Sequence, residues 1–227
     1  MQKSDANVVR DYVRYLKLER GYSSNTIDGY QHDLRKLLDF MQAEGKTVYD
    51  IQLEDLEAFS AGLHDIGVTP TSQCRILSGV RSFCRFLRLD GYRDDDPSVL
   101  LESPQLGKHL PSVLSTAEVD ALEDSIDLSK WEGHRNRAII EVLFSCGLRV
   151  SELITFKLSN LYADERFIRV TGKGSKERLV PISGRAIKEL NLWFVDRNSM
   201  KIKPGEEDYV FLNRRGAHLT RTMILIM

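Results

Sequence analysis

The stretch GLRVSEL, residues 147–153, connects two expected helices and organises the second half of the chain. From Asn136 onward, apolar residues recur with a period of about 3.6 residues, which predicts a helix that ends at the glycine cap Gly147. A second, short helix is expected to begin at Ser151. Arg149 therefore lies at a helix junction, with apolar neighbours on both sides.

A second stretch, TGKGSKERLVP at residues 171–181, indicates a β-hairpin. The segments 167–170 and 178–181 are typical of strands, and the glycine-rich segment between them is typical of a turn. The glycines on both sides of Lys173 allow positive φ angles, so we expect Lys173 to project from the hairpin tip.

Arg149 and Lys173 carry groups that suit phosphoryl transfer. A fixed guanidinium can bind two phosphate oxygens and stabilise the charge of the transition state. A mobile ammonium can protonate an alkoxide leaving group, and its pKa falls when it is desolvated beside cations such as Arg149 and Arg178. The structural alternatives are a pairing of Arg149 with Glu152 or with exposed helix carbonyls, and a solubilising charge at Lys173.

The first hundred residues show the helical period four times and predict four helices, at 8–18, 24–45, about 53–67 and 70–90. We expect the hydroxyl of Ser24 to cap the second helix. Thr69 is expected to cap the fourth, with Pro70 in its first turn.

A change of composition separates two expected domains. Residues 94–97, DDDP, predict the end of a helix. Residues 103–114 contain two prolines and one glycine and show little periodicity, which is typical of a linker. The predicted domains are residues 1–102 and residues 115–227.

The second domain is expected to open with a capping box formed by Ser115 and Glu118. Further helices are predicted at 115–126 and 184–197, and a strand or extended segment at 209–212. The predicted fold class is therefore mainly α, with a small β-sheet or hairpin in the second domain.

Composition excludes several classes of protein. Among 227 residues, 42% are hydrophobic and 29% are charged, which excludes a disordered, collagen-like or membrane-spanning chain. The three cysteines show no CxxC spacing, so neither a disulfide framework nor a zinc site is expected. The amino terminus lacks the apolar core of a signal peptide, and we expect a cytoplasmic protein.

The net charge of −1 hides an uneven distribution. Residues 1–107 carry a net charge of −4 and residues 108–227 a net charge of +3. Four arginines and no acid lie between Ile66 and Leu89, and five basic residues face one glutamate within 169–185. Such stripes are typical of a phosphate-binding surface, and the alternative is two solvated faces.

The arginines of the helix 70–90 are candidate DNA contacts. We expect this helix to enter the major groove with Arg75 and Arg81 reading bases, while Arg85 and Arg88 contact phosphates.

Two further segments are candidate DNA contacts. Ser24, Asn25 and Thr26 begin a helix, where free N–H groups and the helix dipole favour a phosphate; the alternative is a simple helix cap. Lys176 and Arg178 add positive charge beside the hairpin tip.

The stretches at 147–153 and 171–181 together resemble the catalytic signatures of the tyrosine recombinases of the phage-integrase family, and above all the Xer type. The amino-terminal half shares the resemblance through a further set of positions. They are Ser24, Asn25, Thr26, Tyr30, Asp33, Leu34, Arg75, Leu77, Ser78, Arg81, Phe83, Phe86 and Leu87.

This resemblance implies a helical, SAM-like core-binding domain and part of an α+β catalytic domain that close around double-stranded DNA. It implies that Arg149 is the first active-site arginine and that Lys173 is the general acid of the hairpin. The whole protein would recombine DNA at specific sites through a phosphotyrosine intermediate, without metal or other cofactor. Its partners would be further recombinase subunits, as a tetramer on two DNA sites, in chromosome dimer resolution or integration.

The chain departs from the family pattern in its remaining catalytic residues. A literal His-x-x-Arg match at 134–137 lies before Arg149, and we interpret it as chance. A second match, at 218–221, comes too soon after Phe211 and lacks the later tyrosine. None of the eight tyrosines occupies the position expected for the nucleophile. We therefore expect a carboxy-terminally truncated recombinase that binds DNA and is inactive in cleavage.

Two other functions fit parts of the sequence. A noncatalytic DNA-binding regulator with a recombinase-like fold would need only the basic surfaces. An all-helical protein-interaction scaffold would need neither the Gly-Lys-Gly hairpin nor the GLRVSEL junction, and it explains the sequence least well.

Overall fold

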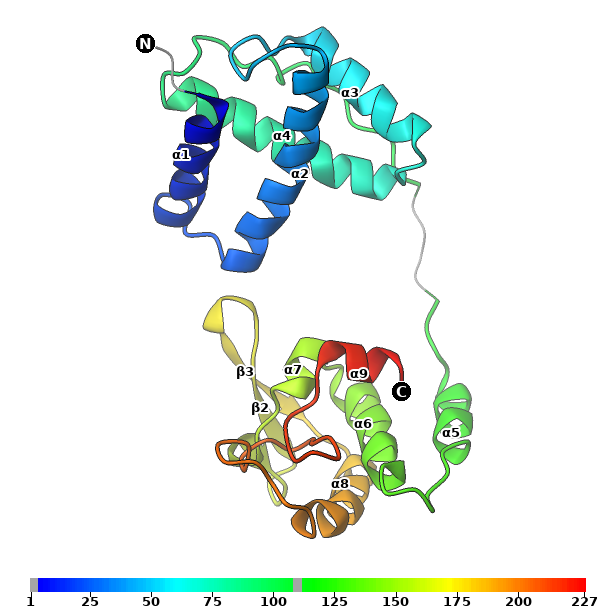
Figure 1. The fold of residues 1–227 in the computed structure, drawn as a ribbon. Helices are drawn as coiled ribbons and strands as arrows, with labels where there is room; N and C mark the ends of the chain where they lie inside the picture. The colour runs from blue at the N-terminus through cyan, green and yellow to red at the C-terminus, as the bar shows by residue number, and fades with distance from the viewer. Residues whose placement is uncertain (1–3, 108–111) are drawn as a thin grey trace. The chain divides into compact units, whose positions relative to one another are not determined.

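The computed structural model describes residues 4–107 and 112–227. The chain forms two compact units, residues 1–110 and 111–227, each with its own hydrophobic core (Figure 1). The predicted fold class is confirmed, because the described part of the chain is mainly helical and carries a small three-stranded sheet in the second unit.

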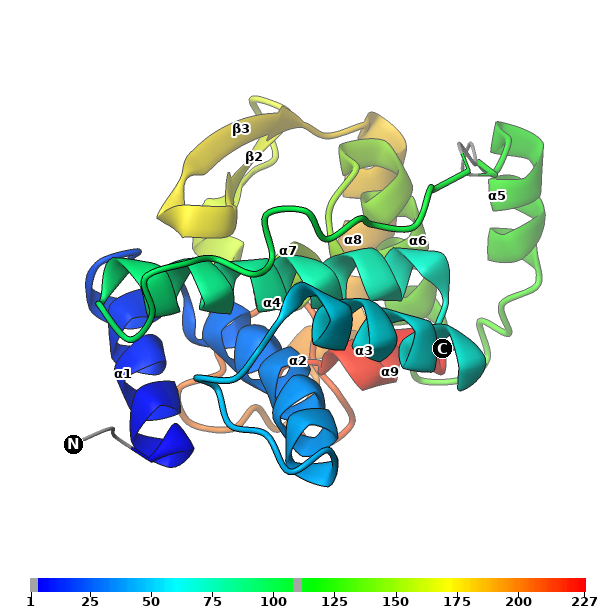
Figure 2. The ribbon, with the colours of Figure 1, turned by 90° about the horizontal axis from the view of Figure 1, so that it is seen from above.

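Four helices build the first unit. They are α1 (Asp5–Leu18), α2 (Ser24–Ala43), α3 (Leu53–Asp65) and α4 (Pro70–Leu89). Helix α4 crosses α1 and α2 and lies beside α3, so it packs against all three (Figure 2). The four predicted helices are therefore confirmed.

The caps of α2 and α4 show how closely the sequence sets helix starts. Thr69 caps α4 by accepting a hydrogen bond from the Ser72 N–H, as predicted. The prediction for α2 was wrong by one residue, because Ser23 has the extended backbone of a cap and accepts from the Thr26 N–H. Ser24 is already the first helical residue.

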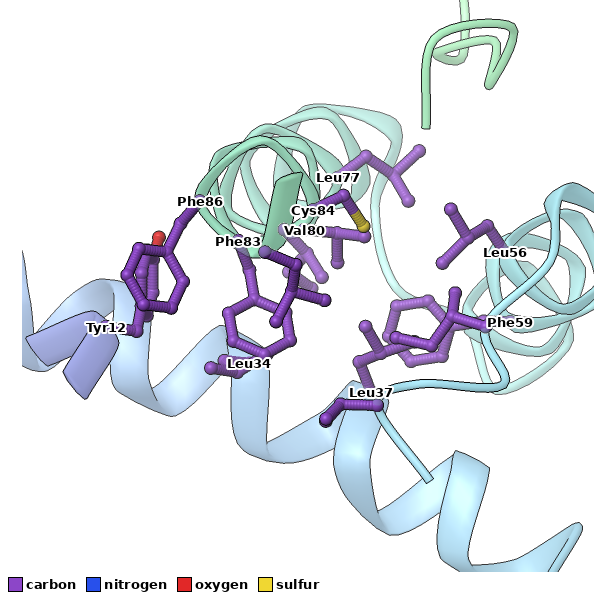
Figure 3. Packing of buried hydrophobic residues seen from close by; sticks show 14 of the residues in the cluster. Tyr12, Leu34, Leu37, Leu56, Phe59, Leu77, Val80, Phe83, Cys84 and Phe86 are labelled. Atoms are coloured by element: carbon purple, nitrogen blue, oxygen red, sulfur yellow. The ribbon is translucent and has the colours of Figure 1, made fainter. Parts of the chain in front are cut away.

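The core of the first unit lies along the buried face of α4 (Figure 3). Phe83 is fully buried, and its ring meets Tyr12 edge-on, with ring centroids 5.1 Å apart. Gly79 lets α2 approach closely, since a Cβ there would lie 3.3 Å from the ring of Tyr30. This contact fixes which face of α2 meets α4.

The chain beyond α4 stays attached to that helix. The Arg81 guanidinium donates to the Leu101 carbonyl over 2.6 Å, and Leu101 is buried in the core. The Cys74 thiol donates to the Pro104 carbonyl over 3.3 Å. Of the predicted linker, residues 108–111 lie outside the described residues.

The second unit combines five helices with one sheet in its described residues. The helices are α5 (Thr116–Asp124), α6 (Gly133–Cys146), α7 (Val150–Ile154), α8 (Gly184–Asn198) and α9 (Arg221–Leu225). The strands are β1 (Leu161–Tyr162), β2 (Phe167–Thr171) and β3 (Glu177–Pro181), all antiparallel in the order β1-β2-β3. The predicted hairpin is β2–β3, and the two-residue β1 extends it.

Packing of α6 against α8 forms the centre of this unit. Trp193 on α8 is fully buried, and its indole N–H donates to the Val210 carbonyl over 2.9 Å.

Helix α5 starts with the predicted capping box at Ser115, and Arg185 of α8 binds the carboxylates of Asp120 and Glu123 on α5. Ion pairs therefore hold α5 to the rest of the unit.

One helix boundary differs from the prediction, and the predicted strand or extended segment at 209–212 does not form a continuous strand. Helix α6 begins at Gly133 instead of Asn136. A side chain at position 133 would collide with the Asp127 carbonyl, because a Cβ there would lie 2.6 Å from its oxygen. Residues 209–212 make only isolated bridges, because the Tyr209 carbonyl accepts from Arg197 and the Val210 carbonyl from Trp193. Side chains thus occupy carbonyls that a strand would use.

No described helix combines the length and the apolar character that crossing a bilayer requires.

Replacing Phe83 tests the core of the first unit. Phe83→Ala should lower the free energy of unfolding by about 3 to 5 kcal/mol, because it leaves a cavity under α4. Leu89→Ala on the same helix is the control, since Leu89 is exposed and its loss should cost at most about 0.5 kcal/mol. Urea unfolding followed by circular dichroism measures both, and equal effects would contradict the packing described here.

Candidate nucleic-acid interface and phosphate site

A hollow of about 350 Å³ lies between α2 and α4 in the first unit. Its lining brings together Asn25 and Thr26 from the start of α2 with Arg75 and Ser78 from α4. Three of the residues predicted from two separate stretches of sequence therefore share one concave surface. Ser24, predicted with them, is exposed at the first turn of α2 but does not line the hollow.

The start of α2 keeps donors available beside this hollow. Ser23 accepts from the Thr26 N–H, and the two hydroxyls lie 2.9 Å apart. Among the described residues the N–H groups of Ser24 and Asn25 have no acceptor. Capping belongs to Ser23, so the cap alternative does not account for Ser24 and Asn25.

A second hollow of about 250 Å³ adjoins the first and shares Tyr30 and Ser78 with it. The rings of Tyr22 and Tyr30 stack here at a centroid distance of 5.8 Å. Arg20 lies over the Tyr22 ring, 5.7 Å from its centroid. Arg20 was not predicted from the sequence as part of this surface, and only its contact with Tyr22 reveals it.

The four predicted arginines of α4 fall into two classes. Arg75 forms an ion pair with Asp33 of α2, and Arg81 is committed to the Leu101 carbonyl. Arg85 and Arg88 are exposed and have no hydrogen-bond or ion-pair partner in the described part of the chain. The expected equivalence of Arg75 and Arg81 is therefore not what the contacts show, because Arg81 already serves the backbone.

In the second unit, Arg149 is the cap residue of α7. Gly147 ends α6 in the left-handed conformation, with φ of 57°, as predicted. The Arg149 N–H donates to Glu152 Oε2 over 2.9 Å, and its Nη1 donates to Oε1 over 3.1 Å. The Arg149 side chain is nevertheless 72% exposed, so most of its guanidinium faces solvent.

Glu152 is the centre of this site. Its side chain is only 4% exposed and accepts two more hydrogen bonds from Arg178 of β3, at 2.7 and 3.0 Å. The bonds from Arg178 and Arg149 lower the pKa of Glu152 to about 2. One buried carboxylate thus links the start of α7 to the β2–β3 hairpin.

Gly172 makes room for the ion pair between Arg178 and Glu152. A Cβ at Gly172 would lie 3.3 Å from Arg178 Nη1 and 3.5 Å from Glu152 Oε1. The prediction that both glycines beside Lys173 supply positive φ is wrong for Gly172, whose φ is −98°. Gly174 does have a positive φ, of 74°.

The hairpin tip is a short 3₁₀ turn, η2 (Lys173–Ser175). The backbone of Lys173 lies in this turn, while its side chain is outside what the structure describes. Lys176 is exposed beside it. Arg178, predicted as a DNA contact and as a cation beside Lys173, directs both Nη atoms to Glu152.

The residues of the two literal His-x-x-Arg matches contact groups other than Arg149 and Glu152. His218 Nδ1 lies 2.7 Å from Glu206 Oε2, the backbone N–H of His218 donates to the same oxygen, and the ring stacks on Tyr209. Arg137 of the other match lies near the carboxylates of Glu123 and Glu189. In the described part of the chain, neither match makes a hydrogen bond to Arg149 or Glu152.

No group of three or more potential metal ligands lies together among residues 4–107 and 112–227. At the Glu152 site, the guanidinium groups of Arg149 and Arg178 are fixed cations, which suit a phosphate group.

Comparisons with known proteins cover nearly the whole chain. Residues 9–91 match the phage integrase N-terminal SAM-like domain, and residues 112–225 match the phage integrase family. Tyrosine recombinase XerD of Staphylococcus aureus is 38% identical over 218 residues, which are 96% of this chain and 74% of that protein.

Solved structures share the fold. A lambda integrase dimer bound to a COC' core site aligns with a TM-score of 0.74 at 18% identity, over 96% of this chain and 60% of that one. XerH site-specific recombinase bound to palindromic difH substrate aligns with a TM-score of 0.69 at 19% identity, over 95% of this chain and 64% of that one. With its two matched domains and its likeness to XerD, the chain belongs to the phage integrase family of tyrosine recombinases.

Proposed function

We propose that this chain binds double-stranded DNA and contributes Arg149 and Lys173 to a site for strand cleavage and rejoining in site-specific recombination. The kinship with XerD supports this class of reaction. The observation that carries the proposal for this chain is the exposed Arg149, which the buried Glu152 holds at the start of α7. A noncatalytic regulator would not need this arrangement.

Arg149 and Arg178 together outweigh the charge of Glu152, so the cluster carries a net positive charge. Glu152 uses the backbone N–H and Nη1 of Arg149, which leaves Nη2 and Nε to bind the two non-bridging oxygens of a phosphate. A guanidinium whose position is fixed beforehand stabilises the charge that develops in the transition state without reorganising. This is the role that we assign to Arg149.

Lys173 supplies the general acid in this proposal. Protonation of the leaving alkoxide requires an ammonium that can reach the bridging oxygen, and a hairpin tip provides that reach. Arg178 lies close to the tip of the hairpin, opposite Val170, and binds Glu152, so the Lys173 turn and Arg149 share one anchor. The assignment of Arg178 as a DNA contact gives way here to a positioning role.

For DNA binding, we propose that the surface formed by the two hollows lies against the duplex. Arg85 and Arg88 contact phosphates, and Arg75 contacts a base. Asn25 and Thr26 line the same hollow as Arg75, and Ser24 and Asn25 offer free N–H groups for a phosphate. Lys176 adds a phosphate contact from the hairpin. Further recombinase subunits on the DNA are the expected partners, as the XerH and lambda integrase complexes with DNA support.

We further propose that these 227 residues bind DNA without cleaving it. Tyr162 stacks on Phe167, and Tyr209 stacks on His218. In the described part of the second unit, neither tyrosine hydroxyl hydrogen-bonds to Arg149 or Glu152. The other six tyrosines belong to the first unit and its exit.

Glu152→Gln tests the anchor through pH. Because the folded state lowers the pKa of Glu152 from its ordinary value near 4.5 to about 2, its contribution is complete above pH 4.5 and is lost as the pH falls toward 2. Glu152→Gln should therefore lower the free energy of unfolding by about 3 kcal/mol at pH 7, and by progressively less below pH 4.5.

Urea unfolding followed by tryptophan fluorescence measures this, since Trp131 and Trp193 both lie in the second unit. Glu177→Gln is the matched control, because Glu177 is exposed and adjoins Arg178 on β3. A loss of stability that stays constant from pH 7 to pH 3 would contradict the anchor.

Arg85→Ala and Arg88→Ala test the phosphate contacts. Each should weaken binding to a random-sequence duplex and reduce the slope of log affinity against log salt by about 0.9, because each contact releases one counterion. Arg35→Ala is the control, since the exposed Arg35 follows Thr26 by nine residues, or about two and a half helical turns, on the opposite face of α2. Fluorescence anisotropy over a salt series measures the slopes, and three equal slopes would refute the assignment.

A covalent-adduct assay tests the absence of cleavage. Duplexes selected from a random pool for binding to this chain, each nicked to trap a cleaved strand, should give a retarded complex on a native gel. On a denaturing gel they should give no protein–DNA adduct, because neither tyrosine in the described part of the second unit hydrogen-bonds to Arg149 through its hydroxyl. An adduct that disappears in Tyr162→Phe or Tyr209→Phe would overturn this proposal and identify the attacking residue.

A further inference from the structure

Asp33 is a buried carboxylate on the face of α2 that meets α4. Its side chain is 3% exposed, and its Oδ2 accepts a hydrogen bond from Arg75 Nη1 across 42 residues of sequence. Its second oxygen, Oδ1, is buried without a hydrogen-bond partner. Gly79, one turn after Arg75, keeps the helices close, since a Cβ there would lie 3.5 Å from Asp33 Cβ.

Stability does not account for this arrangement. Burying a carboxylate costs several kcal/mol, and an ion pair inside a protein rarely repays more than it loses relative to apolar side chains. An acceptor left unused adds to that cost. A functional role for Arg75, the exposed member of the pair, would account for this cost.

Arg75 is the member that faces outward. Its side chain is 55% exposed, whereas that of Asp33 is almost covered. Asp33 accepts from one of the five N–H donors of the guanidinium, so the others remain available to a ligand in the hollow that Arg75 lines together with Asn25, Thr26 and Ser78. The guanidinium is thus tied at one nitrogen and open at the others.

Arg75 differs from the other exposed arginines of α4 because a carboxylate neutralises its charge. Arg85 and Arg88 are exposed and carry full charges without a partner in the described residues, which suits attraction to phosphates at long range. The Arg75–Asp33 pair is neutral as a whole and attracts phosphates weakly. What remains is a set of directed donors in a fixed orientation, which suits recognition of particular acceptors.

Resting on the proposed binding of duplex DNA, we propose that Asp33 is a positioning residue that orients Arg75 to read one guanine. Guanine presents O6 and N7 in the major groove, and their spacing matches two donors of one guanidinium. Asp33 reduces the rotational freedom that Arg75 loses on binding, so the contact discriminates between bases.

The test uses the whole chain and a duplex selected for binding from a random pool. Asp33→Asn keeps the shape of the side chain and removes its charge, and it should reduce the preference for the selected duplex over random duplex by about 5- to 100-fold. Affinity for random duplex should not fall, because removing the Asp33 charge leaves Arg75 with an uncompensated positive charge that attracts phosphates. Arg75→Lys should lose the same preference, and Asp33→Asn combined with Arg75→Lys should lose no more than either alone.

Replacing each guanine of the selected duplex by 7-deazaguanine locates the contact, because this base lacks N7. One position should weaken binding of the unaltered chain and have no effect on Arg75→Lys. Asp55→Asn is the matched control, since Asp55 is also a buried carboxylate of the first unit and pairs with Lys46. Circular dichroism checks that every variant is folded at the assay temperature.

Each outcome decides the question. If Asp33→Asn retains the full preference, or if it weakens random and selected duplexes equally, Asp33 has no positioning role. If Asp33→Asn does not fold, the 7-deazaguanine series with Arg75→Lys still tests the guanine contact, and the absence of a sensitive position overturns it. If the unaltered chain binds no duplex at all, the proposed function itself fails.

Discussion

The carboxylate of Glu152 is the interaction on which the second unit's functional geometry depends. It accepts hydrogen bonds from the backbone and side chain of Arg149 and from both Nη atoms of Arg178. A helix start and a hairpin that are separate in sequence therefore share one buried acceptor. Because a buried carboxylate is costly unless it is fully hydrogen-bonded, the two arginines and Glu152 require one another.

In the first unit, helix α4 determines which basic side chains are exposed. One face of this helix carries apolar side chains such as Val80, Phe83 and Leu87 into the core, and the other face carries arginines. The core fixes the rotation of α4 about its axis, and this rotation decides which arginines meet α2 and which meet solvent. The charged surface is thus a consequence of how the apolar face packs.

Local signals in the sequence predicted the elements well. The Thr69–Pro70 start of α4, the Gly147 end of α6 and the β2–β3 hairpin depend on backbone geometry within a few residues, and all three are confirmed. The start of α6 and the backbone at 209–212 were not predictable in this way. They depend on Asp127 and on Trp193, which reach these segments only through tertiary packing.

Local patterns along the chain were enough to predict the fold class, the positions of the helices and the hairpin, and Arg149 and Lys173 as candidates for phosphate chemistry. How the individual arginines are used depends on contacts between segments that are distant in sequence. Arg178 meets Glu152 across 26 residues and Arg75 meets Asp33 across 42, whereas Arg85 and Arg88 remain exposed. The residue type alone does not distinguish one arginine from another. Their roles differ because packing brings a buried carboxylate within hydrogen-bonding distance of some guanidinium groups and leaves others in water.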